Sequence, residues 1–538
     1  MTTEIRVFGP PGTGKTTYII EKILPEAIAK HGEDKVLITS FTKAAAKEIA
    51  QRLTAKYKIS VEIEPWDEPS ESDAECVRAT TLHAACFAVL GRPKLVTGII
   101  KKWNESYPQW VITSEGGATG ESDSYGGQDI LSQCNIYRNK QIDPLSVPIL
   151  KPFYTKWKEF KTNNHVMDFT DLIEESLKTI FFAPWGATCL ICDEAQDLTK
   201  LEFALIRSWG LQMQELYLAG DDDQCIYSFK GSDPYNFITD DISCQIEKVI
   251  LSKSYRLPKQ IWEFSNQFVK QIKPRQPKEF THSGESGELI RAGFSIAHVD
   301  ELVDIALKES MTGSVLILTS CSYMLKPVCD VMRGLGIQFG NPYRIADKSW
   351  NPCATKAFEL LQDIKNGEGF NVWGEFLDKR TYRKGMTKKQ LEADLDLLYD
   401  KFQSAEGIDL RIESYELMIK YLKDETLDEI DTVWGDTKSR VEWFYNNITL
   451  GERKRFDYAI KTEQCKIQAK NPIMPSTIHA IKGGEADCVF ISPDISPVGF
   501  KQFLSDQNPV LRLFYVGITR ARHKLVILNP STRYHVSL

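Results

Sequence analysis

The sequence predicts an α/β protein with two parallel-sheet domains, each carrying a mainly helical insertion. Three observations support this prediction: strand and helix patterns alternate near the N-terminus, the alternation returns near the C-terminus, and two helical stretches interrupt it. Parallel strands need crossover connections, usually helices, so this alternation is typical of a parallel sheet. The 538 residues are enough for several domains of about 100–200 residues each.

Strand and helix patterns alternate in the first part of the chain. They predict a strand at 5–8, a helix from Thr17, a strand at 35–39 and a helix at 43–57. Residues 62–75 contain seven acidic residues and no basic residue, and we expect a solvated loop there. Helical patterns at 80–110 and 128–182 flank a glycine- and serine-rich segment at 114–127, which is expected to be mobile.

The α/β pattern then resumes and is interrupted once more. It predicts strands at 188–192, 215–219 and 248–251, and further α/β stretches at 314–319 and 334–339. A charged helical stretch follows at 355–462, with a heptad-like run at 388–402. The α/β pattern returns at 475–492 and ends with a strand at 524–528. The expected domains are a first α/β domain at 1–87 and 164–252 with an insertion at 88–163, and a second at 253–354 and 463–538 with an insertion at 355–462.

Composition and charge exclude some classes of protein. The net charge of −7 argues against a protein coated in basic side chains, although a local basic cleft remains compatible with it. The sequence has no apolar stretch of transmembrane length and no signal-peptide pattern before Gly9, so we expect a cytoplasmic protein that does not bind membranes. The twelve cysteines show no disulfide framework, and Cys189 and Cys192 are expected to be small apolar residues of a buried strand.

A phosphate-binding loop follows the first predicted strand. The pattern G-x-x-x-x-G-K-[ST] is met, with a helix behind it, by Gly9, Pro10, Pro11, Gly12, Thr13, Gly14, Lys15 and Thr16. Backbone N–H groups of such a loop surround phosphate oxygens, and Lys15 can reach the outer phosphates. The hydroxyl of Thr16 can bind Mg²⁺. The motif therefore predicts a nucleoside triphosphate site, in which Thr17 also takes part.

Two acidic turns follow predicted strands. Asp193 and Glu194 end the apolar run at 188–192, where Asp193 can hold Mg²⁺ and Glu194 can polarise an attacking water. A surface acidic turn is the alternative interpretation. In the second turn, Gln224 can sense a γ-phosphate.

Aromatic and basic residues follow Gln224 directly. Tyr227 and Phe229 can stack on bases, and Lys230 can contact a nucleic-acid phosphate. Core packing is the alternative for both aromatic rings. If the stacking interpretation is correct, one short loop touches nucleotide on one side and nucleic acid on the other.

Together these segments resemble the superfamily 1 helicases of the UvrD/Rep type. The similar segments occur in the family's order and include 38–48 (motif Ia), 79–83 (Ib), 168–172 (Asp-Phe-x-Asp-Leu), 254–256 (IV), 476–485 (V) and 513–522 (VI). The resemblance suggests a compact bacterial or phage member with two RecA-like domains. It implies an enzyme that uses ATP and Mg²⁺ to move 3′→5′ on single-stranded DNA and to unwind duplex DNA.

The resemblance also implies roles for single residues. Tyr255 would stack on adenine, Arg256 would meet the γ-phosphate, Glu485 would contact the ribose and Arg520 would be an arginine finger. The DNA contacts carried over from the family motifs are Phe41, Thr42, Lys43, Thr81, His83, Thr477 and His479. Taken alone, Thr81 also fits a helix cap and His479 a satisfied polar residue.

The sequence departs from the family pattern in several places and leaves the finer function open. Phe41, Thr42 and Lys43 stand where Thr-Asn-Lys is usual. The eight residues before Gly9 contain no glutamine that could read adenine, so adenine selectivity is expected to rest on Tyr255. Gly484 replaces a usual leucine.

Three alternative functions remain open. They are a single-stranded-DNA-dependent ATPase that unwinds little duplex, a nucleotide-gated subunit of a larger complex and a ring-forming ATPase, which motifs III to VI argue against. We expect a monomer whose partners are DNA and replication or repair proteins.

Overall fold

The described part of the chain is α/β throughout. The computed structural model describes residues 2–40, 49, 51–54, 61–63, 76–113, 126–242, 244–340, 461, 465 and 468–538. Within these ranges, no helix combines the length and the apolar character needed to cross a bilayer.

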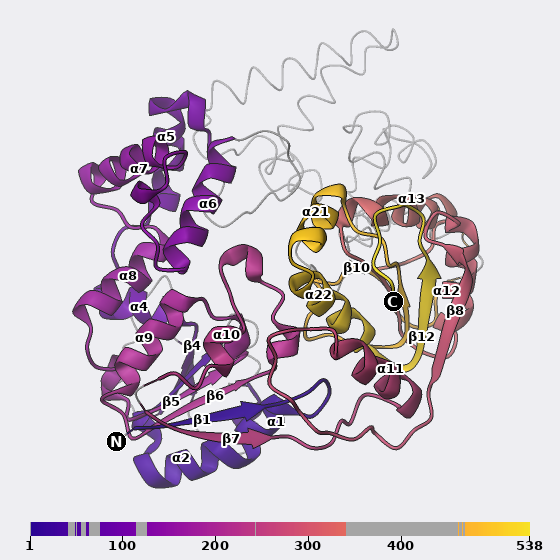
Figure 1. The fold of residues 1–538 in the computed structure, drawn as a ribbon, viewed down its shortest axis with the longest axis horizontal. Helices are drawn as coiled ribbons and strands as arrows, with labels where there is room; N and C mark the ends of the chain where they lie inside the picture. Colours follow the sequence, from indigo (N-terminus) through magenta and orange to yellow (C-terminus); the bar gives the residue numbers. More distant parts are fainter. Residues whose placement is uncertain are drawn as a thin grey trace, which may run out of the picture. The chain divides into compact units, whose positions relative to one another are not determined.

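The described residues of the first half form a parallel sheet of seven strands in the order β3-β4-β2-β5-β6-β1-β7 (Figure 1). The strands are β1 Thr3–Phe8, β2 Val36–Ser40, β3 Val61–Ile63, β4 Val77–Thr80, β5 Cys189–Asp193, β6 Glu215–Gly220 and β7 Gln245–Ile250. β1 pairs in parallel with both β6 and β7, and β5 pairs in parallel with β6. The carboxyl ends of β1, β5 and β6 therefore meet at one edge of the sheet, where parallel α/β sheets bind ligands.

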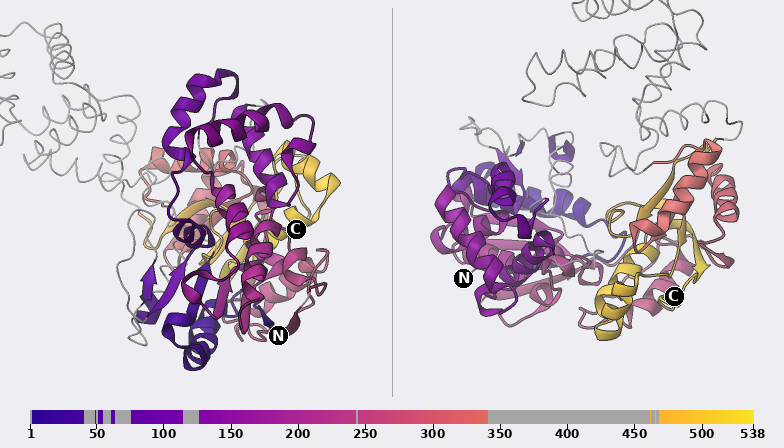
Figure 2. Two further views of the ribbon diagram at one scale, coloured as in Figure 1. Left: turned by 90° about the vertical axis from the view of Figure 1, so that its left-hand side faces the viewer. Right: turned by 90° about the horizontal axis from the view of Figure 1, so that it is seen from above.

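Helices cover both faces of this sheet (Figures 1 and 2). One apolar core contains residues of a π-helical turn, Ile19–Ile23, and of α2, Leu24–His31, which follow α1, Lys15–Tyr18. The core on the other face contains residues of α4 Leu82–Val89, α8 Phe169–Thr179 and α9 Lys200–Gly210. Cys189 belongs to the first core and Cys192 to the second, so the two thiols point to opposite faces of the sheet and do not form a redox pair.

The helical insertion of the first half has a core of its own. Its helices are α5 Ile100–Ser106, α6 Gly127–Asn139 and α7 Lys151–Asn164. Trp103 lies edge-on to Trp157, with ring centroids 4.9 Å apart, and Phe153 packs against both. The aromatic residues seen in the sequence of this segment therefore form its hydrophobic core.

The described part of the second half contains a five-stranded sheet in the order β10-β9-β11-β12-β8. Its strands are β8 Glu288–Ser295, β9 Val315–Thr319, β10 Ile473–Thr477, β11 Ala486–Ile491 and β12 Ala521–Asn529. The described helices of this half are α11 Lys259–Val269, α12 Val299–Ser310, α13 Lys326–Leu335, α21 Pro497–Ser505 and α22 Asn508–Ile518, whereas the short α10, Tyr235–Ile238, belongs to the first half and precedes β7.

The chain divides into two compact units. The first comprises Met1–Ile296, Leu318–Met324 and Thr477–Leu538, and the second comprises Ala297–Ile317 and Leu325–Ser476. Every site contact given below lies within the first unit. The domain limits expected from the sequence stay a prediction.

Most expected strands are confirmed, including those at 188–192, 215–219 and 524–528. The prediction of a loop from residue 62 is wrong for its first two residues, because β3 extends to Ile63 and pairs with β4. The alternation of apolar and polar residues at 61–63 is a short strand pattern. Residues 336–339 contain no strand, although α/β structure was expected at 334–339. Residues 49 and 51–54 are helical, as expected, whereas 64–75, 114–125 and the heptad-like run at 388–402 lie outside the described residues.

Candidate nucleotide-binding and nucleic-acid-binding site

The glycine-rich loop connects β1 to α1. Gly12 and Gly14 have φ angles of 72° and 75°, and Gly14 immediately precedes α1. A Cβ atom on Gly9 would lie 2.0 Å from Cγ of Lys15, so a side chain at this position would displace the lysine. Lys15 Nζ donates to the carbonyl of Gly9 at 3.3 Å, which folds the side chain back over the loop. Residues 9–15 thus form a tight turn that holds the Lys15 side chain against the loop.

The residues expected to hold Mg²⁺ lie next to each other. Thr16 Oγ1 donates to Asp193 Oδ2 at 3.1 Å, although the two residues are 177 positions apart in the sequence. Burial and the neighbouring Glu194 raise the pKa of Asp193 to about 6. A hydroxyl and a carboxylate form the hard oxygen donor set that Mg²⁺ prefers, so these two residues fit the ion.

Glu194 combines an unusual backbone with an ionised side chain. Its φ of 55° is in the left-handed region, which non-glycine residues adopt rarely and often at functional sites. Burial opposes ionisation of its carboxyl, but the charges of Lys15 and Lys482 outweigh burial and lower the pKa. Gln196 donates its amide to the same carboxylate. Glu194 is therefore held as a carboxylate beside the phosphate-binding loop.

Gln224 links two distant segments of the chain. Its Nε2 donates to Asp221 Oδ2 at 2.7 Å, and its Oε1 accepts from Nη2 of Arg520 at 2.7 Å. Arg520 is only 2% exposed, and its Nε donates to the carbonyl of Val516. The arginine expected from motif VI thus contacts the glutamine expected from the second acidic turn.

The segment of motif IV lies directly on the phosphate-binding loop. Ser254 Oγ donates to the carbonyl of Pro11, and Tyr255 N donates to the carbonyl of Gly12, each at 2.8 Å. The Tyr255 side chain is 73% exposed, which leaves its ring accessible for stacking. Arg256 Nε pairs with Glu485, so the residues expected at the γ-phosphate and at the ribose bind each other here.

Aromatic and basic side chains gather beside Gln224. The ring centroid of Phe229 lies 5.9 Å from that of Tyr227 and 5.6 Å from that of His479, and Lys230 Nζ lies 5.3 Å from the Tyr227 ring. Phe229 is 41% exposed, so it does not belong to the core. Burial lowers the pKa of His479 to about 4, and the imidazole is neutral at physiological pH. The exposure of Phe229 argues against core packing for this ring, whereas Tyr227 is only partly exposed.

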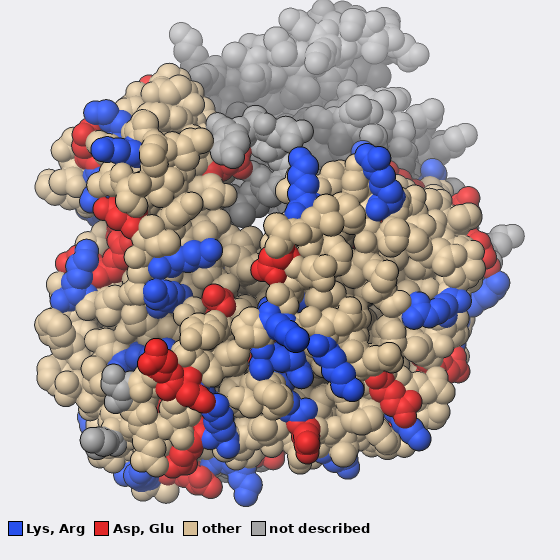
Figure 3. All heavy atoms as spheres, in the orientation of Figure 1, with Lys and Arg blue, Asp and Glu red and all other residues tan. Residues whose placement is uncertain are grey.

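The other expected DNA contacts are less closely grouped. Thr81 caps α4 by accepting from Ala84 N, and Thr477 Oγ1 accepts from Ala480 N. His83 lies 3.8 Å from Glu202 and packs edge-on to Phe169. Phe41, Thr42 and Lys43 lie outside the described residues. On the face drawn in Figure 3, basic and acidic side chains are interspersed.

The structure adds residues that sequence reasoning missed. Lys482 Nζ pairs with Asp197, donates to the carbonyl of Gln224 at 2.8 Å and lies 5.1 Å from the Tyr227 ring. Burial raises the pKa of Asp197 to about 7, and Lys482 counteracts this shift. Lys482 belongs to the motif V segment, but no local pattern predicts its partner. Only the folded chain brings the two residues together.

Three consecutive aspartates after β6 are close enough to share a cation, but a protein side chain already occupies that place. Carboxylate oxygens of Asp221, Asp222 and Asp223 lie within 4.8 Å of one another. Lys278 Nζ lies 2.8 Å, 2.5 Å and 2.8 Å from them, respectively, and Arg275 also pairs with Asp223. These aspartates form ion pairs, and we do not interpret them as a metal centre.

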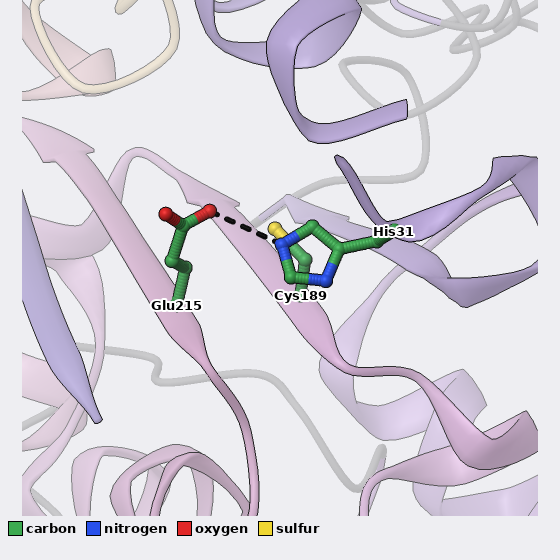
Figure 4. Close-up of side chains that lie close together, drawn as sticks. All are labelled: His31, Cys189 and Glu215. Atoms are coloured by element: carbon green, nitrogen blue, oxygen red, sulfur yellow. Dashed lines mark hydrogen bonds and ion pairs between the residues drawn. The ribbon is translucent and has the colours of Figure 1, made fainter. Parts of the chain in front are cut away.

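A second group of ligand-type atoms lies at the opposite edge of the sheet. His31, Cys189 and Glu215 come together where β5 and β6 begin (Figure 4). His31 Nε2 lies 3.2 Å from Glu215 Oε2, and Lys30 Nζ lies 2.6 Å from the other carboxylate oxygen. Burial raises the pKa of the Cys189 thiol to about 12. With the carboxylate paired and the thiol protonated, we interpret this group as a structural network.

Comparison with known proteins shows the class to which this fold and site belong. The UvrD/REP helicase N-terminal domain matches residues 1–245, and the UvrD-like helicase C-terminal domain matches residues 473–528. The chain belongs to the UvrD-like superfamily 1 DNA helicases, as the sequence motifs predicted, and its two parallel α/β sheets are those of two RecA-like domains. Helicases of this family use ATP.

Individual relatives match over nearly the whole chain. The ATP-dependent DNA helicase PcrA of Staphylococcus epidermidis is 22% identical, with 99% of this chain and 82% of the relative covered. A probable DNA helicase II homolog of Mycoplasma capricolum is 25% identical, with 97% and 82% covered. PcrA of Staphylococcus aureus is 22% identical, with 99% and 82% covered.

Proposed function

We propose that the chain couples ATP hydrolysis to 3′→5′ movement on single-stranded DNA and unwinds duplex DNA as it moves. The observation that carries this proposal is the contact between Gln224 and Arg520. Gln224 follows a strand adjacent to the phosphate-binding loop, whereas Arg520 comes from the C-terminal part of the chain. Loss of the γ-phosphate would therefore change the contacts of the Gln224 turn and of the Arg520 segment at the same time.

The proposed nucleotide site assigns a role to each group. Lys15, Gln224, Arg256 and Arg520 surround the γ-phosphate and stabilise the charge of the transition state. Thr16 and Asp193 would hold Mg²⁺, which neutralises phosphate charge when bound. Glu194 accepts a proton from the attacking water, a role that its ionised state supports. Tyr255 stacks on the adenine and Glu485 contacts the ribose.

The proposed DNA site begins one short loop away from Gln224. Phe229 and Tyr227 offer ring faces to successive bases, and Lys230 contacts the backbone. The further DNA contacts in this proposal are Thr477, His479, Thr81 and His83, and Phe41, Thr42 and Lys43 are included on the strength of their motif alone. Because Lys482 contacts both the Gln224 carbonyl and the Tyr227 ring, nucleotide and DNA contacts share one connected group of side chains.

Unwinding of 3′-tailed and 5′-tailed duplexes, measured side by side with ATP and Mg²⁺, tests this proposal. We expect strand displacement from the 3′-tailed substrate only, and none with Lys15→Ala. Preference for the 5′ tail would refute the proposed polarity. DNA-stimulated ATP hydrolysis without strand displacement would support the alternative, a translocating ATPase or a subunit of a larger complex with little unwinding of its own. ATP hydrolysis that does not respond to DNA would refute the coupling.

A further inference from the structure

Lys278 is a buried lysine with three acidic partners. Its side chain is 1% exposed, and its Nζ contacts Asp221, Asp222 and Asp223. A lysine is expensive to bury unless its charge is paired and hydrogen-bonded. Burial alone would lower the pKa of Lys278, but the three carboxylates outweigh burial and raise it well above its usual value. The ammonium group is therefore a fixed positive charge inside the protein.

Asp221 passes the effect of this charge to Gln224. Burial opposes ionisation of Asp221, but Lys278 outweighs burial and lowers the pKa of the carboxyl. An ionised carboxylate can only accept hydrogen bonds. Gln224 must therefore present its amide nitrogen to Asp221, as it does at 2.7 Å, and this leaves its amide oxygen facing Arg520.

We propose that Lys278 is a positioning residue for ATP turnover, which fixes the amide of Gln224 through Asp221 so that its oxygen faces Arg520. The inference rests on the proposed role of Gln224 at the γ-phosphate. Without the lysine, Asp221 takes up a proton and can donate to the amide oxygen. The amide then turns over and presents its N–H groups to the guanidinium of Arg520, which cannot accept a hydrogen bond.

Arg275 provides a matched control within the same ion-pair group. Its guanidinium pairs with Asp223 at 2.7–3.2 Å, whereas no contact between Arg275 and Asp221 occurs among the described residues. Lys278→Gln and Arg275→Gln each remove one positive charge from the same three aspartates. A purely structural role predicts equal effects on turnover, whereas the proposed role predicts a loss for Lys278 only.

The experiment measures kcat and KM for ATP with single-stranded DNA, ATP binding by a fluorescent nucleotide analogue, and the melting midpoint. For Lys278→Gln we expect kcat to fall about 10–100-fold, by analogy with the loss typical when a group that orients a metal ligand is removed, with ATP affinity near that of wild type. Arg275→Gln is expected to keep its kcat. Equal kcat losses in the two variants would overturn the proposal.

Asp221→Asn covers the case in which Lys278→Gln does not fold. This substitution keeps the shape of the side chain, removes one negative charge and allows donation to the amide of Gln224. We expect the same loss of kcat with ATP binding retained. Wild-type turnover in this variant would overturn the proposal.

A double variant separates the inference from the proposed function. If Lys278 acts through Gln224, Lys278→Gln combined with Gln224→Ala has the kcat of Gln224→Ala alone. Additive losses would overturn the positioning role and leave the role of Gln224 intact. Wild-type turnover in Gln224→Ala would instead refute the role of Gln224 on which the inference rests.

Discussion

At the scale of single residues, Glu194 is held by its surroundings in a conformation that its own backbone disfavours. A left-handed non-glycine residue costs about 1–3 kcal/mol and persists only where neighbouring structure determines it. Here the fixed turn after β5 places an ionised carboxylate beside Lys15. The strain therefore coincides with the group that is proposed to activate water.

Glu194→Gln is expected to retain binding of ATP and single-stranded DNA but to lose turnover by about 10²–10⁴-fold, because the amide cannot accept the proton. Steady-state ATP hydrolysis and nucleotide binding check this. Glu174→Gln serves as a control, because Glu174 pairs with Arg138 on the insertion side. If Glu194→Gln hydrolyses ATP as wild type does, another group is the base.

Phe229→Ala is expected to weaken single-stranded DNA binding by about 1–3 kcal/mol, the contribution of one stacked base. DNA-stimulated ATP hydrolysis should fall more than basal hydrolysis, because the ring is exposed and does not support the core. Fluorescence anisotropy with labelled DNA measures the affinity. Phe181→Ala removes another exposed ring from the same unit and should change neither activity. Equal losses of basal and stimulated activity would indicate a packing role for Phe229.

At the scale of elements, the phosphate-binding loop and motif IV are in contact. A Cβ on Gly12 would lie 2.4 Å from Cβ of Arg256, and the φ of 72° would add about 1–2 kcal/mol of strain for an L-residue. Gly12→Ala is therefore expected to weaken ATP binding and slow turnover. Nucleotide titration checks this against Gly98→Ala, since a Cβ on Gly98 meets no atom within 4 Å. Unchanged ATP binding in Gly12→Ala would show that the loop adapts.

A buried ion-pair network joins the helical insertion to α8. Asp168 accepts from Arg138 on α6, and from Trp157 Nε1 and Lys161 on α7. Asp168→Ala leaves two buried cations without this partner and should destabilise the insertion by about 3–5 kcal/mol. Denaturant unfolding followed by tryptophan fluorescence measures the change. Glu159→Ala, which removes an exposed ion pair on α7, should unfold like wild type. If both variants unfold alike, the network contributes little.

At the scale of the whole molecule, Lys482 ties the C-terminal segment to two turns of the first sheet. Lys482→Met removes the partner of Asp197 and the donor to the Gln224 carbonyl, both of which are buried. We expect a lower thermal midpoint together with reduced DNA stimulation of ATP hydrolysis. Lys501→Met, at an exposed position of α21, should change neither. A wild-type midpoint in Lys482→Met would show that the segment is held by other contacts.

The sequence predicts the strands that are buried on both faces, because their apolar runs are continuous. β5 and β6 are examples, with buried residues almost throughout. β8 is mostly exposed or partly buried, with only Ala292 and Ser295 buried, and it includes charged residues, so this strand was not predicted. β3 and β4 were not predicted for another reason, because three and four residues are too few to give a recognisable strand pattern.

The expected nucleotide-site residues could be proposed because each motif has a characteristic local spacing. The contact between Thr16 and Asp193 follows from two motifs that were both visible in the sequence. Lys278 and the pairing of Lys482 with Asp197 could not be predicted, because a lone lysine in a polar segment has no local pattern that names its partner. Contacts between distant segments require the fold.

The placement of the thiols on the two faces of the first sheet has a practical consequence for labelling. Burial raises the pKa of both Cys189 and Cys192 to about 12, so neither offers a thiolate to a maleimide dye at neutral pH. Among the described cysteines, only Cys244, Cys321 and Cys465 are partly accessible. A cysteine introduced at an exposed position such as Val498 is therefore expected to react ahead of Cys189 and Cys192, and the three partly accessible thiols are the ones to replace before a fluorescent dye is attached.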